Sequence, residues 1–114
     1  MRALLWYRAT GDEVQNLERA YREIGAGLVD VPGLRGNELL RSVSAPGEFV
    51  VASEWESLVA FRAWADDPAH RAHTGKLDGY RHLDRPAGRY ELYEIAGTAT
   101  GRGHTDRADR EAPL

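Results

Sequence analysis

The chain has 114 residues, a length typical of a single domain, with a formal net charge of -3 and no cysteine. The missing cysteines exclude disulfides, thiolate metal sites, iron–sulfur clusters and cysteine nucleophiles. The mild acidity is unlike the basic surface of a nucleic-acid-binding protein, and no apolar run approaches the roughly 20 residues that cross a bilayer. The apolar start of the chain is too short for a signal peptide, so we expect a soluble cytoplasmic protein.

A strand and a helix are expected first. Residues 2–8 are apolar and aromatic enough for a strand. Further along, apolar side chains recur at spacings of three and four, as on one face of a helix: Val14, Leu17, Tyr21, Ile24 and Leu28. Thr10 or Asp12 is expected to cap this helix, which must end before Pro32.

A hairpin, a second helix and a last strand complete the predicted elements. Residues 34–43 and 48–56 resemble two strands joined by turn-forming residues, which predicts an antiparallel hairpin. Ser57 is expected to cap the second helix, and a helical turn resumes across 69–77 after a proline. Residues 89–95 alternate like a strand.

This order, β-α-β-β-α-β, predicts an α+β protein with a ferredoxin-like fold in residues 1–96. Residues 97–114 carry almost no large apolar side chains, so we expect them to form a disordered tail.

Several of the expected strands are apolar on both faces, as in Leu4-Leu5-Trp6-Tyr7 and Phe49-Val50-Val51-Ala52. Strands of that kind are normally buried on both sides, whereas the helices of this fold cover only one face of the sheet. We therefore expect a homodimer whose two sheets pack face to face.

Short motifs in the expected order resemble a known family. Pro32-Gly33-Leu34-Arg35-Gly36 leads into a strand, and Glu54-Trp55-Glu56-Ser57 closes the hairpin and opens a helix. Phe61, Trp64 and His70 follow. Over residues 2–96 the chain resembles the antibiotic biosynthesis monooxygenase domain of the dimeric α+β barrel superfamily. The resemblance implies a dimer with a pocket between sheet and helices in each copy. Activities in that superfamily include metal-free and flavin-free oxygenation of aromatic polyketides, haem degradation and quinol oxidation.

Five residues are candidates for binding a small aromatic substrate. Trp64 offers a flat wall for stacking, although core packing is the alternative, and Phe61 lies three residues before it. Trp55 lies where strand meets helix, which favours a structural role. Tyr7 leaves the first strand toward one face or the other, and His73 is either a pocket residue or a solvated one.

Three residues are candidates for catalysis. His70 is the proposed proton carrier, because the resemblance places a histidine just after this helix and imidazole exchanges protons near neutral pH. Asn37 either faces the cavity and donates to a substrate oxygen or lies at an exposed edge. Arg81 belongs to a polar group ahead of the last strand, at a pocket mouth or in a solvated loop. His70 and His73 share a helical spacing, but no third ligand has a recognised spacing, so no metal site is expected.

The expected function is that of a cofactor-independent monooxygenase in secondary metabolism, with dioxygen as co-substrate and a polyketide-type phenol, anthrone or hydroquinone as substrate. Two alternatives stay open. One is a non-redox dimer that binds or cyclises a polyketide. The other is a haem-degrading monooxygenase, for which Trp64 and either His70 or His73 fit the family pattern. The first strand, however, lacks the asparagine that haem-degrading relatives carry.

Overall fold

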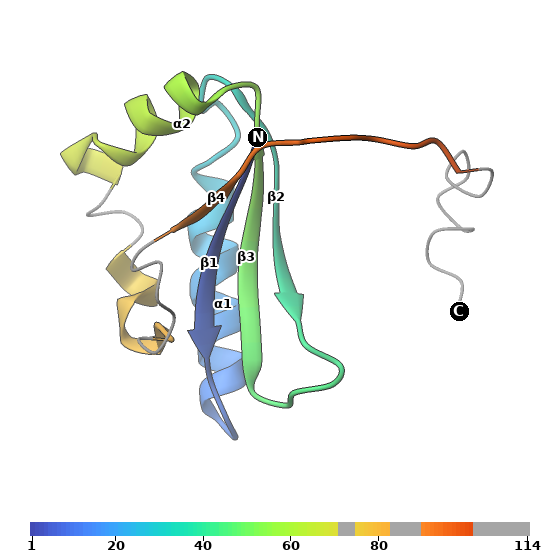
Figure 1. Ribbon diagram of the computed structural model, residues 1–114. Coiled ribbons are helices and arrows are strands. Elements are labelled where there is room, and N and C mark those ends of the chain that lie inside the picture. The colour runs from blue at the N-terminus through green and yellow to red at the C-terminus, as the bar shows by residue number, and fades with distance from the viewer. Residues whose placement is uncertain (71–74, 83–89, 102–114) are drawn as a thin grey trace.

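The computed structural model describes residues 1–70, 75–82 and 90–101. Its elements follow the expected order, and Figure 1 shows their arrangement. They are β1 (Arg2–Arg8), α1 (Glu13–Ala26), β2 (Leu34–Arg41), β3 (Glu48–Trp55), α2 (Leu58–Ala65), the 3-10 helix η1 (Gly75–Tyr80) and β4 (Glu91–Tyr93).

The four strands form one antiparallel sheet in the order β2-β3-β1-β4. This order confirms the α+β, ferredoxin-like prediction. Two separate segments share the outer edge of β1. β4 pairs with Arg2–Leu4, and Arg81 forms an isolated bridge with Tyr7 further along the same strand. The His82 N–H continues that edge by donating to the Trp6 carbonyl at 2.9 Å.

α1 covers one face of the sheet, and its predicted apolar stripe explains why. Leu17 is fully buried and Ile24 is 3% exposed, and both pack against Tyr7 and Phe49 from the two central strands. Leu77 of η1 joins the same cluster. The helix ends at Ala26, before Pro32 as expected.

The predicted side-chain cap of α1 is wrong. Asp12 occupies the N-cap position, but its backbone is already helical (φ -65°, ψ -21°) and its carboxylate makes no capping hydrogen bond. The Glu13 carboxylate instead accepts from the Thr10 N–H at 3.4 Å and the Thr10 hydroxyl at 3.5 Å.

α2 begins as predicted. Ser57 is extended, and its hydroxyl accepts from the Ala60 N–H at 3.1 Å. The helix holds an aromatic cluster against the end of β3: the Phe61 ring meets the Trp55 ring edge-on at 5.5 Å, and the Trp64 ring lies 5.4 Å from Trp55. These contacts anchor α2 to the sheet.

A close approach joins the α1–β2 loop to α2. Gly33 has φ +81°, and a Cβ built on it would lie 2.5 Å from the Ala60 Cβ. The Gly33 carbonyl also accepts the Glu56 N–H at 2.8 Å. Only glycine satisfies both the left-handed backbone and the short distance.

A β-bulge interrupts β2 near its start. Leu34 pairs with Trp55 and Gly36 pairs with Glu54, so Arg35 is an extra residue. Because of this extra residue, Leu34 and Asn37 lie on the same face of the sheet, although simple alternation would place residues three apart on opposite faces.

The face that α1 leaves uncovered, toward the viewer in Figure 1, is apolar at its centre. The register places five apolar side chains on this open face: Leu4, Trp6, Leu40, Val50 and Ala52. The prediction of strands that are apolar on both faces is therefore confirmed. Glu38 and Glu91 also lie on this face, opposite Ala52 and Leu4.

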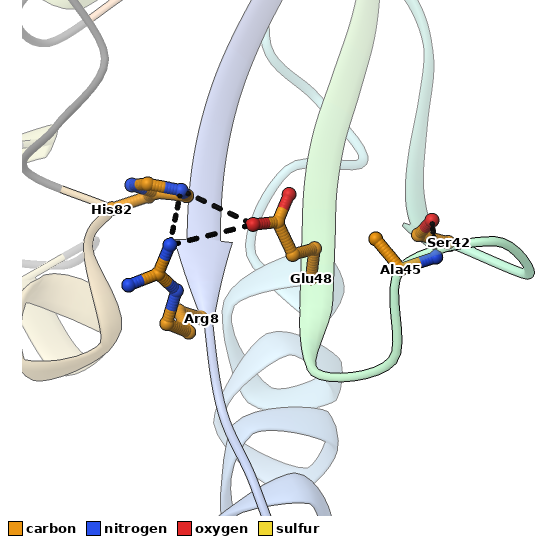
Figure 2. A network of polar contacts seen from close by, with 5 residues as sticks. All are labelled: Arg8, Ser42, Ala45, Glu48 and His82. Atoms are coloured by element: carbon orange, nitrogen blue, oxygen red, sulfur yellow. Dashed lines mark hydrogen bonds and ion pairs between the residues drawn. The ribbon is translucent and has the colours of Figure 1, made fainter.

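Further charged groups flank the apolar side chains at both ends of the strands. Arg2 pairs with Glu54 at 3.2 Å at one end. At the other end Arg8 lies 3.4 Å from the Glu48 carboxylate and 2.8 Å from Nε2 of His82, as Figure 2 shows. The same Nε2 lies 3.3 Å from the Glu48 carboxylate, so Arg8, Glu48 and His82 form one network at this end of the face.

The predicted last strand is shorter than expected. Of residues 89–95, only Glu91–Tyr93 pair, and position 89 lies outside the described residues. Of the predicted tail, residues 97–101 are described and exposed. Within the described part of the chain, no helix has the length and apolar character needed to span a membrane.

Candidate functional site

A pocket lies between the sheet and the α1–η1 side of the molecule. Its cavity volume is about 50 Å³. A cavity of this size holds a few water molecules at most and is well below the volume of a typical small-molecule site. Aliphatic and aromatic side chains form most of the wall, and its polar members are Tyr7, Tyr21, Asn37, Ser53, Trp55, Trp64, Asp78, Arg81 and Tyr90.

Two of these polar groups are already occupied by structural hydrogen bonds. Ser53 is 7% exposed, accepts from Nε1 of Trp55 at 2.8 Å and donates to the Ala3 carbonyl at 3.2 Å. Trp55 itself is 2% exposed. This chain of bonds satisfies the buried indole and hydroxyl, so both residues serve the packing of β1 on β3.

Tyr21 and Asn37 meet across the pocket wall from α1 and β2. The Tyr21 hydroxyl donates to Oδ1 of Asn37 at 2.6 Å. Burial raises the pKa of Tyr21 above its ordinary value of 10.0, and the negative charge of Glu38 raises it further. The phenol therefore remains a hydrogen-bond donor throughout the physiological range.

This raised pKa predicts how stability depends on alkaline pH. A tyrosine with a higher pKa in the folded state binds its proton more tightly there than in the unfolded chain. The stability that this tyrosine contributes is complete below its pKa in the unfolded chain, near 10. It is lost as the pH rises through the higher pKa of the folded state. We therefore expect the wild type to lose free energy of unfolding relative to Tyr21→Phe above pH 10. Urea denaturation of both proteins across that range measures the difference, and a constant difference would contradict the expectation.

Trp64 carries an unsatisfied donor. Its Nε1 is buried and has no hydrogen-bond partner within residues 1–70, 75–82 and 90–101. The His70 ring stacks on the indole at 5.4 Å with 30° between the planes. Nδ1 of His70 lies 3.0 Å from the Trp64 carbonyl. A carbonyl only accepts, so Nδ1 carries a proton and donates it to this bond.

Arg81 is fixed in the wall through its backbone. Its bridge to Tyr7 places both residues on the α1 face of the sheet, and its N–H donates to the Asp78 carbonyl at 3.4 Å. Arg81 and Asp78 are the charged residues of the lining, so an anionic and a cationic ligand group each have a possible counter-charge.

The structure brings together five of the predicted residues in this pocket: Tyr7, Asn37, Trp55, Trp64 and Arg81.

Phe61 does not line the pocket. Its ring is 4% exposed and packs edge-on against Trp55 and Tyr90. His70 stands against Trp64 outside the lining, and His73 lies outside the described residues. Within the described ranges, no group of three or more His, Cys, Asp or Glu side chains could hold a metal ion.

Sequence reasoning missed two lining residues that matter. Tyr21 was placed only in the apolar stripe of α1, although its hydroxyl at a buried position signals a hydrogen-bond partner. Ser53 was not singled out. Gly36 indicates the bulge that turns Asn37 inward, because an isolated glycine in a strand often marks a bulge.

Solved structures support the fold. The chain is similar to SnoaB, a cofactor-independent oxygenase from Streptomyces nogalater, with a TM-score of 0.67 and 18% identity over 85% of this chain and 93% of that one. It is also similar to a heme-degrading protein of Mycobacterium tuberculosis, with a TM-score of 0.63 and 21% identity over 88% and 94% of the two chains. At these identities the likeness concerns the fold alone.

Sequence comparison finds closer relatives and a family. The chain is 39% identical over 59 residues, 52% of its length, to "Heme oxygenase (mycobilin-producing)" of Mycobacterium tuberculosis. It is 33% identical over 88 residues, 77% of its length, to "Protein SchA" of Streptomyces halstedii. The matches span 56% of the first relative and 23% of the second. The sequence profile described as antibiotic biosynthesis monooxygenase matches residues 2–76. The chain therefore belongs to the antibiotic biosynthesis monooxygenase family.

Proposed function

We propose that the chain is a cofactor-independent monooxygenase acting on a polycyclic aromatic phenol, anthrone or hydroquinone of polyketide type. The observation that carries this proposal is the buried Nε1 of Trp64, which has no acceptor within the described residues although its ring forms part of the pocket wall. An unpaired buried donor costs about 1–3 kcal/mol, and a ligand oxygen that lies in the plane of the indole, at its N–H edge, would remove that cost.

The proposed chemistry needs only a proton acceptor, donors for an anion and dioxygen. With an anthrone, removal of a ring proton gives an electron-rich enolate. One electron passes to dioxygen, and the resulting radical pair combines into a hydroperoxide at the former CH₂ carbon once a proton returns. Loss of water from the hydroperoxide then gives the quinone, so anthrone plus O₂ yields quinone plus H₂O.

Each task has a candidate side chain. Trp64 supplies an aromatic wall for the ring system, and Asn37 and Arg81 supply donors for the enolate oxygen. The Trp64 N–H points out at the edge of the indole and is a donor for a ligand oxygen that lies beside that edge. His70 is the proposed proton acceptor, because its Nδ1 bond to the Trp64 carbonyl leaves the lone pair on Nε2. Since His70 stands outside the lining, a water molecule or a turn of the Trp64 ring must connect it to the substrate.

The pocket must widen before it can admit a tricyclic substrate, because a cavity of about 50 Å³ is too small for such a ring system. The half-buried Trp64 ring lies between the pocket and His70. We infer that substrate entry displaces this ring and brings its N–H and His70 toward the ligand.

We also propose that a second copy of the chain covers the open face. The five apolar side chains form a patch of the kind that marks an interface. Charged groups border it at both strand ends and, through Glu38 and Glu91, on the two outer strands. A two-fold axis through the patch would place the same residues on both sides of the contact. The dimer would then consist of two sheets packed face to face, with one pocket in each copy.

The oxygenase proposal is tested by oxygen uptake of metal-free protein with 1,8-dihydroxyanthrone. We expect one O₂ consumed per anthrone. Trp64→Phe keeps a ring but loses the N–H, and one hydrogen bond to an anion is worth about 1.5–3 kcal/mol, so kcat should fall roughly tenfold or more. Trp6→Phe on the open face is the matched control and should retain the wild-type rate.

One outcome would contradict the oxygenase proposal, and another would contradict only the role of Trp64. Quenching of tryptophan fluorescence by the anthrone without oxygen uptake would favour a non-redox dimer that binds or cyclises a polyketide. Equal rates for Trp64→Phe and wild type would remove Trp64 from the reaction while leaving the activity itself in place.

Haem degradation is the second candidate, favoured by the 39% identity to a heme oxygenase. His70 could hold a haem iron through Nε2, because its Nδ1–H is held by the Trp64 carbonyl. In this conformation the pocket does not suit the macrocycle, because the cavity of about 50 Å³ is too small and His70 is not in its lining. A haemin titration separates the candidates, since a Soret shift that saturates at one haem per protomer and disappears in His70→Ala or His73→Ala would favour haem.

A further inference from the structure

The Tyr21–Asn37 hydrogen bond lies in the pocket and determines which atoms the amide can offer to a ligand. The two residues come from different elements, α1 and β2, and their side chains meet at 2.6 Å in the pocket wall. This distance is at the short end of the range for a hydroxyl donor and a carbonyl acceptor. The bond therefore holds the amide group in one orientation.

The backbone supports this arrangement. The bulge at Arg35 places Asn37 on the α1 face, opposite Ser53 of β3. Without the extra residue, alternation would move either Leu34 or Asn37 to the open face, away from Tyr21. A polar residue in the strand is thus turned inward by a local irregularity, next to a tyrosine that can bind it.

The chemistry of the amide gives the consequence. An asparagine side chain has one acceptor oxygen and one NH₂ donor. Because Tyr21 donates to Oδ1, the NH₂ group is the part left to interact with a ligand. If the tyrosine were absent, the amide could turn over and present its oxygen instead. Burial and Glu38 both keep the phenol protonated, so this preference does not reverse near neutral pH.

We propose that Tyr21 is a positioning residue that fixes Asn37 as a hydrogen-bond donor and thereby makes the pocket select flat aromatic ligands that carry a ketone or phenolate oxygen. The choice of an aromatic ligand rests on the proposed function, whereas the positioning of Asn37 by Tyr21 does not. A ring with an accepting oxygen satisfies the Asn37 NH₂ group. A ring without such an oxygen leaves this donor without a partner in the pocket, which disfavours its binding.

The selection is tested by binding, without turnover. Anthraquinone-2-sulfonate and anthracene-2-sulfonate share a tricyclic ring and a sulfonate, and only the first has ring oxygens. In wild type we expect tryptophan quenching to show roughly tenfold tighter binding of the anthraquinone, the ratio for one hydrogen bond of about 1.4 kcal/mol. Tyr21→Phe should lose most of this ratio while its affinity for anthracene-2-sulfonate stays the same. An unchanged ratio in Tyr21→Phe would overturn the selection.

Asn37→Asp gives a second variant that retains a partner for the Tyr21 hydroxyl but replaces the NH₂ donor with an acceptor. We expect it to lose the anthraquinone preference as well. A preference retained in Asn37→Asp would show that the amide is not the selective group, even if Tyr21→Phe failed to fold.

A measurement without ligand tests the positioning of Asn37 by Tyr21 separately from the proposed oxygenase function. The side-chain NH₂ signals of Asn37, identified by their loss in Asn37→Leu, can be followed by ¹⁵N–¹H NMR. We expect them to shift in Tyr21→Phe, because the amide loses its hydrogen-bond partner. Unchanged signals would overturn the positioning role whatever the ligand. Shifted signals with neither tricycle bound would instead uphold the positioning role and reject the aromatic ligand class.

Discussion

Val50→Asp is expected to convert the proposed dimer into a folded monomer. Val50 lies on the open face in the central strand β3, opposite Trp6 of β1 on one side and Leu40 of β2 on the other. A two-fold interface would contain the new carboxylate twice, without a partner in either copy. Burying each unpaired charge costs about 3–5 kcal/mol, so the dissociation constant should rise by roughly a thousandfold or more.

A matched control separates this effect from a general effect of charge. Val59 is 78% exposed on α2, away from the open face, and Val59→Asp makes the same chemical change there. Sedimentation velocity over a range of protein concentrations measures the association of both variants, and circular dichroism checks that they are folded. A monomeric wild type at micromolar concentration, or a dimeric Val50→Asp, would contradict the face-to-face dimer.

Gly33→Ala is expected to destabilise the fold by about 3 kcal/mol, through two separable effects. A left-handed backbone costs a non-glycine residue about 1–2 kcal/mol. In addition, the new Cβ would lie 2.5 Å from the Ala60 Cβ, and overpacking of this kind costs about 1–3 kcal/mol. Thermal unfolding should show a melting temperature lowered on the order of 10 °C.

Two further variants separate strain from clash. Gly11 also has a positive φ, +59°, but a Cβ there meets nothing within 4 Å, so Gly11→Ala should cost only the strain of about 1 kcal/mol. Ala60→Gly removes the opposing methyl, and the Gly33→Ala/Ala60→Gly double variant should be more stable than the sum of the single effects predicts. Strict additivity would show that the contact with Ala60 contributes nothing.

The sequence was sufficient to predict the fold because the strongest patterns were long. The spacing of Leu17 and Ile24 predicts the buried stripe of α1, and the doubly apolar strands predict an open face with Trp6 and Val50 at its centre. Such patterns survive small errors in element boundaries, since many residues contribute to each of them.

The pocket was harder to predict because it depends on single residues and irregular backbone. Asn37 faces α1 only because Arg35 is an extra residue in β2. The partner of Tyr21 lies on another element, so helical periodicity gives no information about it. His70 contacts Trp64 rather than the pocket, because the chain after α2 folds its imidazole onto the indole. Phe61 shares a helix with Trp64 but packs behind Trp55.

The divided outer edge of β1 has a consequence for aggregation. β4 satisfies the backbone of Arg2–Leu4, while residues 81 and 82 bond to the remainder of the strand. If either segment detached, part of a long apolar strand would present unpaired N–H and C=O groups to other molecules, which is how sheets recruit foreign strands. Conditions or truncations that loosen residues 91–93 would therefore promote self-association through β1 before the helix-packed core itself unfolds.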